Sequence, residues 1–103
     1  MFAVKECQRV VNDKPIITFR REIVSANILE VEAGTNGYQG GDSGHGSRTY
    51  IRIEDVGSTD IEVTPKENGV EIVLGGDCEL ETMIRALKFI TKVLEDQAAE
   101  VID

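Results

Sequence analysis

The chain has 103 residues, with 19 acidic and 11 basic side chains, a formal net charge of −8 and an isoelectric point near 4.6. This length is expected to form one domain, residues 1–103, whose core needs neither disulfides nor metal. The negative surface repels phosphate backbones, and the sequence has no basic stripe of the kind that binds nucleic acid or a membrane surface. We therefore expect neither a nucleic-acid polymer nor a membrane as a partner.

The N-terminal residues 1–13 carry charges throughout and lack the apolar segment of a signal peptide, and no apolar run reaches the ~18–20 residues of a membrane span. Cys7 and Cys78 lie far apart, outside any C-x-x-C spacing, as expected for two buried thiols in a reducing compartment. These features predict a cytoplasmic protein.

The first half of the chain is rich in β-type patterns. The first dozen residues fit both an alternating strand and a helix, and we predict a strand. Residues 16–23 are again β-rich, and residues 28–33 alternate, with apolar side chains inward and Glu30 and Glu32 outward.

Three further strands are predicted between the middle of the chain and its last third. Residues 49–54 alternate and are closed by a turn at Gly57-Ser58. Residues 60–64 and 70–74 form a hairpin through Asn68-Gly69, a dipeptide typical of tight turns.

The last quarter predicts an amphipathic helix that runs from an N-cap at Asp77 to about Glu100. Its apolar residues recur at steps of three and four: Leu80, Met83, Ile84, Leu87, Ile90, Leu94, Ala98 and Val101. The expected fold class is α+β, an antiparallel sheet of about five or six strands with one long C-terminal amphipathic helix packed on it.

Such a helix would be ~33 Å long, whereas strands of five or six residues span ~17–20 Å. The helix would then overhang the sheet and leave Leu94, Ala98 and Val101 in need of cover. A second copy of the chain is the simplest cover, so we expect a helix-mediated homo-oligomer, a dimer or higher.

The segment Gly34–Gly46 contains six of the ten glycines and is much longer than a hairpin connection. Ordering so many glycines is entropically costly, and Tyr38, Asp42, His45 and Arg48 interrupt the pattern of a plain spacer. We interpret it as an ordered binding loop, the alternative being a solvated mobile loop.

The loop offers the parts of a nucleotide site. Glycine N–H groups form anion-holding nests, tyrosines stack bases, and Arg48 and Arg52 can meet phosphate. The candidate ligand-binding residues are Asn36, Tyr38, Gly40, Gly41, Asp42, Ser43, Gly44, His45, Arg48 and Tyr50. The alternatives are that Tyr50 and Arg52 only line the exposed face of a strand and that His45 is only a hydrogen-bonding loop residue.

Enzymatic motifs are not supported. The run Gly41–Gly44 is similar to the nucleophile segment of chymotrypsin-like proteases, but those place the histidine before the serine, and His45 follows Ser43. No Walker A or G-x-G-x-x-G pattern is present. Asp42 and His45 would need another protein ligand to hold a metal. We predict no catalytic residues, no metal and no cofactor; a small hydrolase using Asp42, Ser43 and His45 is a minor alternative.

The run from Val31 to Tyr38, the run from Gly40 to Tyr50, and the later stretch from Leu74 to Asp77 with the helix around Ala86 resemble small proteins of phages and mobile elements. Among these the chain resembles the first Thoeris anti-defence family, phage sponge proteins that sequester cyclic ADP-ribose signals made by bacterial TIR-domain enzymes. The resemblance covers Ile16 to Gln97 and implies a non-enzymatic, oligomeric binder acting in the host cytoplasm. Its ligand would be a cyclic ADP-ribose isomer, and cyclic oligonucleotides as a second class.

A different function is compatible with the same charges. Nineteen acidic residues suit an acidic protein-interaction module, such as an inhibitor of a basic nucleic-acid-binding enzyme. The simpler interpretation of those carboxylates is a solvated sheet face.

Overall fold

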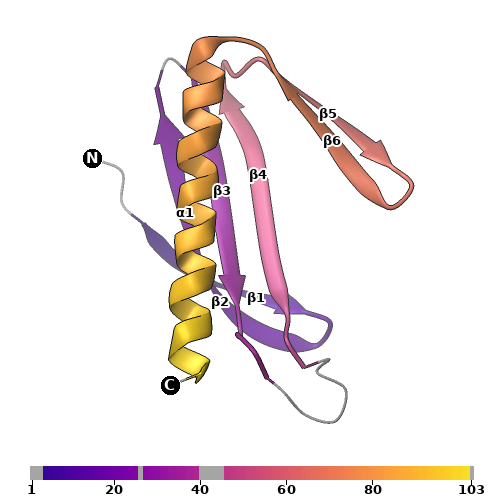
Figure 1. Ribbon diagram of the computed structural model, residues 1–103, viewed down its shortest axis with the longest axis vertical. Coiled ribbons are helices and arrows are strands. Elements are labelled where there is room, and N and C mark those ends of the chain that lie inside the picture. Colours follow the sequence, from indigo (N-terminus) through magenta and orange to yellow (C-terminus); the bar gives the residue numbers. More distant parts are fainter. Residues whose placement is uncertain (1–3, 26, 40–45, 103) are drawn as a thin grey trace.

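The computed structural model describes residues 4–25, 27–39 and 46–102, with side chains as far as Ala99. Its elements are β1 (Lys5–Val11), β2 (Lys14–Val24), β3 (Ile28–Thr35), β4 (Thr49–Gly57), β5 (Ile61–Lys66), β6 (Gly69–Leu74) and α1 (Asp77–Ile102) (Figure 1). The predicted α+β fold, with antiparallel strands and one long C-terminal helix packed on them, is confirmed. No helix among the described residues is both long and apolar enough to cross a membrane.

The strands form two sheets. Strands β1 to β4 pair in chain order in a four-stranded antiparallel sheet, and β5 and β6 form a separate hairpin. The β1–β2 turn places Asn12 and Asp13 at φ of 49° and 68°, as a two-residue type I′ turn requires, so the N-terminal segment is a strand as predicted. In the second hairpin Lys66 pairs with Gly69, so the turn lies one residue earlier than the predicted Asn68-Gly69.

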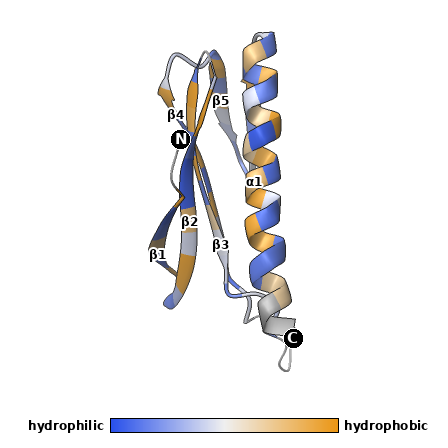
Figure 2. Cartoon of the chain, turned by 90° about the vertical axis from the view of Figure 1, so that its left-hand side faces the viewer, coloured by the Kyte–Doolittle hydropathy of each residue, from blue (hydrophilic) through white to orange (hydrophobic). Residues whose placement is uncertain are grey.

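The core lies between α1 and one face of the four-stranded sheet. The helix packs mainly along β3 and less along β2, and Figure 2 shows it on one side of the sheet with β1 on the other. The buried apolar residues of this interface are Ile23, Val31, Ala33, Ala86, Ile90 and Val93. Alternation in β3 and three- and four-residue spacing in α1 therefore bury the residues that the sequence pattern indicated.

The sheet is longer than expected. Strand β2 has 11 residues and spans ~37 Å at 3.4 Å per residue. The helix α1 has 26 residues and is ~39 Å long. The helix nevertheless exceeds β3, the strand along which it mainly packs, because the eight residues of β3 span only ~27 Å. Leu94 and Ala98 border a pocket with the flanks of the glycine-rich loop.

Strand β1 approaches β4 across the face of the sheet opposite α1. Within the β2–β3 pair the backbones come close together at Gly34, where an added Cβ would lie 2.4 Å from the Ile17 carbonyl oxygen and 2.7 Å from the Thr18 Cα. Gly34 belongs to β3, and the loop begins only after Thr35. This glycine therefore permits the close approach of β2 to β3, and it lies before the loop rather than within it.

The helix begins at Asp77, and the Gly76 carbonyl accepts the first intrahelical hydrogen bond from Leu80 N at 3.1 Å. Gly76, rather than the predicted Asp77, thus occupies the N-cap position. Cys78 is exposed and Cys7 is partly buried, so the expectation of two buried thiols is wrong.

Candidate functional site

Asn36 joins the two arms of the glycine-rich loop at their base. Its backbone N–H donates to the Arg48 carbonyl at 3.2 Å, and its side-chain oxygen accepts from Arg48 N at 2.7 Å. Its side-chain amide donates to the Gly46 carbonyl at 3.2 Å. A Cβ on Gly46 would lie 2.8 Å from the Cβ of Gln39, so the close approach of the arms requires glycine at position 46.

Thr35 connects this base to the helix. Its hydroxyl donates to the Arg48 carbonyl and accepts from Gly37 N, both at 3.0 Å, and lies 3.0 Å from the Thr49 hydroxyl. Its backbone N–H donates to the side-chain oxygen of Gln97 on α1 at 3.0 Å. The described flanks of the loop are therefore ordered by side-chain hydrogen bonds and are tied to the C-terminal third of α1.

A pocket of about 290 Å³ lies between these flanks and the helix. It is lined by Thr35, Gly37, Tyr38, Ser47, Thr49, Leu94, Glu95 and Ala98. Four hydroxyl groups and one carboxylate thus surround a cavity with two aliphatic side chains on the helix side. Such a mixture of apolar surface and a few polar groups is typical of small-molecule sites. We call this cavity the loop pocket.

The predicted site residues divide into three groups. Tyr38 lines the loop pocket with its side chain 69% exposed. Asn36 and Arg48 lie at the base of the loop. Tyr50 lies on the opposite face of the sheet, where the Arg9 guanidinium sits 5.1 Å from its ring centroid. The remaining candidates, Gly40, Gly41, Asp42, Ser43, Gly44 and His45, lie outside the described residues.

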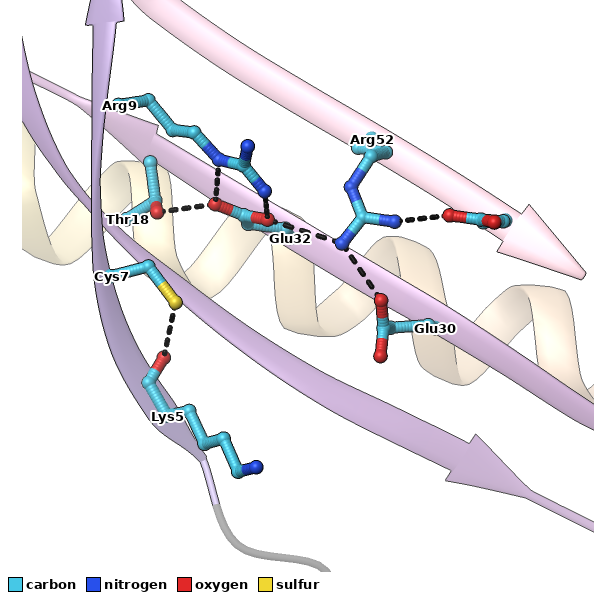
Figure 3. Close-up of polar contacts among 8 residues, drawn as sticks. Lys5, Cys7, Arg9, Thr18, Glu30, Glu32 and Arg52 are labelled. Carbon is cyan, nitrogen blue, oxygen red and sulfur yellow. Dashed lines mark hydrogen bonds and ion pairs between the residues drawn. The ribbon is translucent and has the colours of Figure 1, made fainter. Parts of the chain in front are cut away.

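A cluster of charged side chains occupies the face of the sheet opposite α1 (Figure 3). At its centre is Glu32 of β3, which is fully buried. The Arg9 guanidinium donates to both carboxylate oxygens of Glu32, at 2.7 and 2.6 Å. Thr18 donates at 2.5 Å and Arg52 at 3.2 Å. The expectation that Glu32 lies on a solvated sheet face is wrong.

The cluster accounts for the largest electrostatic effects in the described residues. Hydrogen bonds from Arg9, and then from Thr18 and Arg52, lower the pKa of Glu32 to about 2. Arg52 also donates to Glu30 at 2.8 Å and to Glu54. This commitment to three carboxylates argues against the expectation that Arg52 meets a phosphate.

The sequence did not single out most of the loop pocket. Thr35, Ser47 and Thr49 flank the glycine-rich loop, and polar residues next to a candidate loop were the only available signal for them. Leu94 and Ala98 were noted as apolar residues in need of cover, but they lie far from Tyr38 in the sequence, which gave no sign that the three line one pocket. The pocket depends on the docking of α1, which the local sequence does not specify.

Comparisons of this sequence with protein-family models, with curated proteins and with solved structures find no match.

Proposed function

We propose that this protein is a non-enzymatic binding protein that holds a small nucleotide-type ligand in the loop pocket. The observation that carries the proposal is the pocket itself, in which loop flanks fixed by Asn36 and Thr35 meet α1. Pockets of ~300 Å³ and above are the usual size class for small-molecule sites.

The lining fits the nucleoside part of such a ligand. The exposed Tyr38 ring offers a surface on which a base can stack. Thr35, Ser47 and Thr49 place hydroxyl groups within the same cavity, and Glu95 adds an acceptor for ribose hydroxyls. Leu94 supplies apolar contact area on the helix side.

Among the described residues, the groups with clearly shifted pKa values lie away from the loop pocket. Glu32 and Arg52 belong to the ion-pair cluster on the far face of the sheet. Glu79, whose pKa is lowered chiefly by the Asp60 backbone N–H, lies at the start of α1. None of these groups lines the loop pocket.

The biological role follows from the sequence resemblance. We infer that the ligand is an immune signal of bacterial anti-phage defence, a cyclic ADP-ribose isomer or a cyclic oligonucleotide, which the protein sequesters in the host cytoplasm. The residues that carry this inference are the runs around the glycine-rich loop, Val31–Tyr38 and Gly40–Tyr50.

A homo-oligomer is supported by apolar side chains that the chain leaves uncovered. Leu80, Ile84 and Leu87 form a stripe on α1 that is 60, 39 and 50% exposed. Ile51 lies on the helix side of β4, opposite Ala33, and is 53% exposed. The β5–β6 hairpin, which projects beside β4 in Figure 1, exposes four more apolar residues, Val63, Val70, Ile72 and Val73. Apolar surface of this extent usually marks a protein interface.

The same hairpin favours the alternative function, an acidic protein-interaction module. It carries Glu62, Glu67 and Glu71 beside its exposed valines, as a surface for a basic protein would. In the proposed binding protein the hairpin contacts a second copy of the chain, and the loop pocket is required for activity. In the interaction module the hairpin contacts a basic protein, and the loop pocket is not required.

The test is a ligand screen by thermal shift with nucleotides, cyclic ADP-ribose isomers and cyclic oligonucleotides. A ligand present at 100 times its Kd stabilises the fold by about 2.7 kcal/mol. Ala98→Phe fills the pocket and should abolish the shift, whereas Ala99→Phe, on the neighbouring exposed position, should keep it. Mass spectrometry should recover the ligand unaltered. A shift that survives Ala98→Phe, or a chemically altered ligand, contradicts the proposal.

A further inference from the structure

A second cavity, of about 570 Å³, lies on the other flank of α1, between the helix and the β1–β2 side of the sheet. Its lining contains Val4, Arg21, Arg85, Lys88, Phe89, Lys92, Val93 and Asp96. Four cations therefore face one carboxylate in a chain whose net charge is −8. We call this cavity the basic groove. It shares no lining residue with the loop pocket.

Most of these cations lack a carboxylate partner. Lys92 pairs with Asp96 at 3.0 Å, which neutralises the single acid of the groove. Across the described residues Arg21, Arg85 and Lys88 form no ion pair, and the only partner recorded for Arg85 is the Val24 carbonyl at 3.1 Å. The groove thus keeps three uncompensated positive charges.

Arg21 is the most informative of the three. It is half-buried on β2, and its Nε is buried without a hydrogen-bond partner in the described part of the chain. Its guanidinium lies 5.6 Å from the centroid of the Phe89 ring, which holds the planar group at the groove wall. By contrast, Arg9 and Arg52 on the far face are both paired with glutamates. A partly desolvated guanidinium without an acceptor is a site that an anion would complete.

We propose that the basic groove binds the phosphate or pyrophosphate group of a small molecule. Three converging cations suit a group with more than one negative charge, and the planar Arg21 guanidinium matches two phosphate oxygens at once. The remaining chain is acidic and repels a polyanion, so the ligand is a small phosphate compound rather than a nucleic acid. The proposal does not rest on the function of the loop pocket.

The test is calorimetric titration of the full chain at low salt with inorganic pyrophosphate, with ADP and with a short single-stranded oligonucleotide. Arg21→Gln should weaken pyrophosphate binding about tenfold or more, because a charge-assisted bidentate contact is lost. The matched control is Arg20→Gln, which removes the same charge from the neighbouring position on the opposite face of β2 and should change binding less than about twofold. Similar losses in both variants would reduce the effect to net charge and overturn the proposal.

Two further variants separate the remaining outcomes. Lys88 is exposed, so Lys88→Gln should fold normally and should also weaken pyrophosphate binding. This variant provides the test if Arg21→Gln does not fold. Tyr38→Ala, in the loop pocket, should leave pyrophosphate binding unchanged even if it abolishes binding of a nucleotide signal. Equal affinity for ADP and pyrophosphate would assign recognition to the phosphates alone, as proposed. No binding of pyrophosphate by the unaltered chain, or tighter binding of the oligonucleotide, would overturn it.

Discussion

The Arg9 guanidinium and the Glu32 carboxylate are joined by two hydrogen bonds of 2.7 and 2.6 Å, although the residues lie 23 positions apart in the chain. Arg9 is on the edge strand β1 and Glu32 is on the central strand β3. The ion pair therefore links β1 to β3 across β2. Arg52 of β4 reaches the same carboxylate from the other side. One buried glutamate therefore links β1, β3 and β4 on the face of the sheet opposite α1.

Glu32→Gln is expected to destabilise the fold strongly. The amide has no charge with which to compensate Arg9 and Arg52, and breaking a buried ion pair costs about 3–5 kcal/mol. Because the Arg9 side chain is 38% exposed, we expect the lower end, about 3 kcal/mol, in urea unfolding at neutral pH. Glu54→Gln, at a side chain that is 58% exposed, should cost under about 1 kcal/mol. Equal losses in the two variants would contradict a central role for Glu32.

Protonation of the Glu32 carboxylate should destabilise the fold at low pH. The folded-state pKa of Glu32, about 2, lies below its ordinary value of 4.5, so the unfolded chain binds the proton more readily. The stabilisation is fully present above pH 4.5 and is lost as the pH falls towards 2. Glu79 contributes in the same direction, since its pKa is also lowered. Urea midpoints measured from pH 6 to pH 2 should fall less steeply for Glu32→Gln than for the unaltered chain; parallel curves would refute this.

Local patterns in the sequence predicted the helix and its sheet but not the face opposite the helix. Alternation placed Val31 and Ala33 inward and α1 spacing placed Ala86 and Ile90 against them, as observed. Glu32 follows the same alternation and was expected in solvent. Its burial depends on the curvature that brings β1 over β3, and that curvature is a long-range property of the sheet.

In the β5–β6 hairpin the difference between pattern and structure is reversed: residues whose pattern indicates burial are exposed. Its alternation is typical of strands with one buried face, yet Val63 and Val70 are more than half exposed. The pattern correctly predicted two paired strands but not what covers them. The glycine-rich loop was located by its composition, whereas the pocket that Tyr38 and Leu94 both line depends on packing between segments far apart in the chain.

Gly34→Ala should destabilise the sheet. The added Cβ would lie within 2.4 to 2.7 Å of backbone atoms of Ile17 and Thr18, which cannot move without displacing β2. We expect a loss of about 3 kcal/mol or a failure to fold, as for severe overpacking. Gly69→Ala is the matched control, because nothing lies within 4 Å of its added Cβ. That variant should be neutral or slightly stabilising in urea unfolding, and an unperturbed Gly34→Ala variant would refute the close approach.

Gln97→Ala should loosen the loop pocket from the helix. The Gln97 side chain accepts from Thr35 N at 3.0 Å and donates to the Ile17 carbonyl at 2.8 Å. Losing both hydrogen bonds should cost about 1–2 kcal/mol and speed hydrogen exchange at the Thr35 amide. Thr91→Ala, at an exposed position on the same helix, should change neither quantity. Unaltered Thr35 exchange in Gln97→Ala would show that this bond does not hold the pocket.

Leu87→Glu should convert an oligomer into a monomer. Leu87 lies in the exposed stripe with Leu80 and Ile84, and a charge there could not be buried against a second copy without a large desolvation cost. Light scattering after gel filtration should give at least twice 11.3 kDa for the unaltered chain and 11.3 kDa for the variant, with the same circular dichroism. Val10→Glu introduces the same charge at an apolar residue of β1 that is 71% exposed and should leave the oligomer intact. A monomeric unaltered chain at about 100 μM, well above the Kd of a stable dimer, would contradict the homo-oligomer and leave the stripe and the β5–β6 hairpin as surfaces for a different protein.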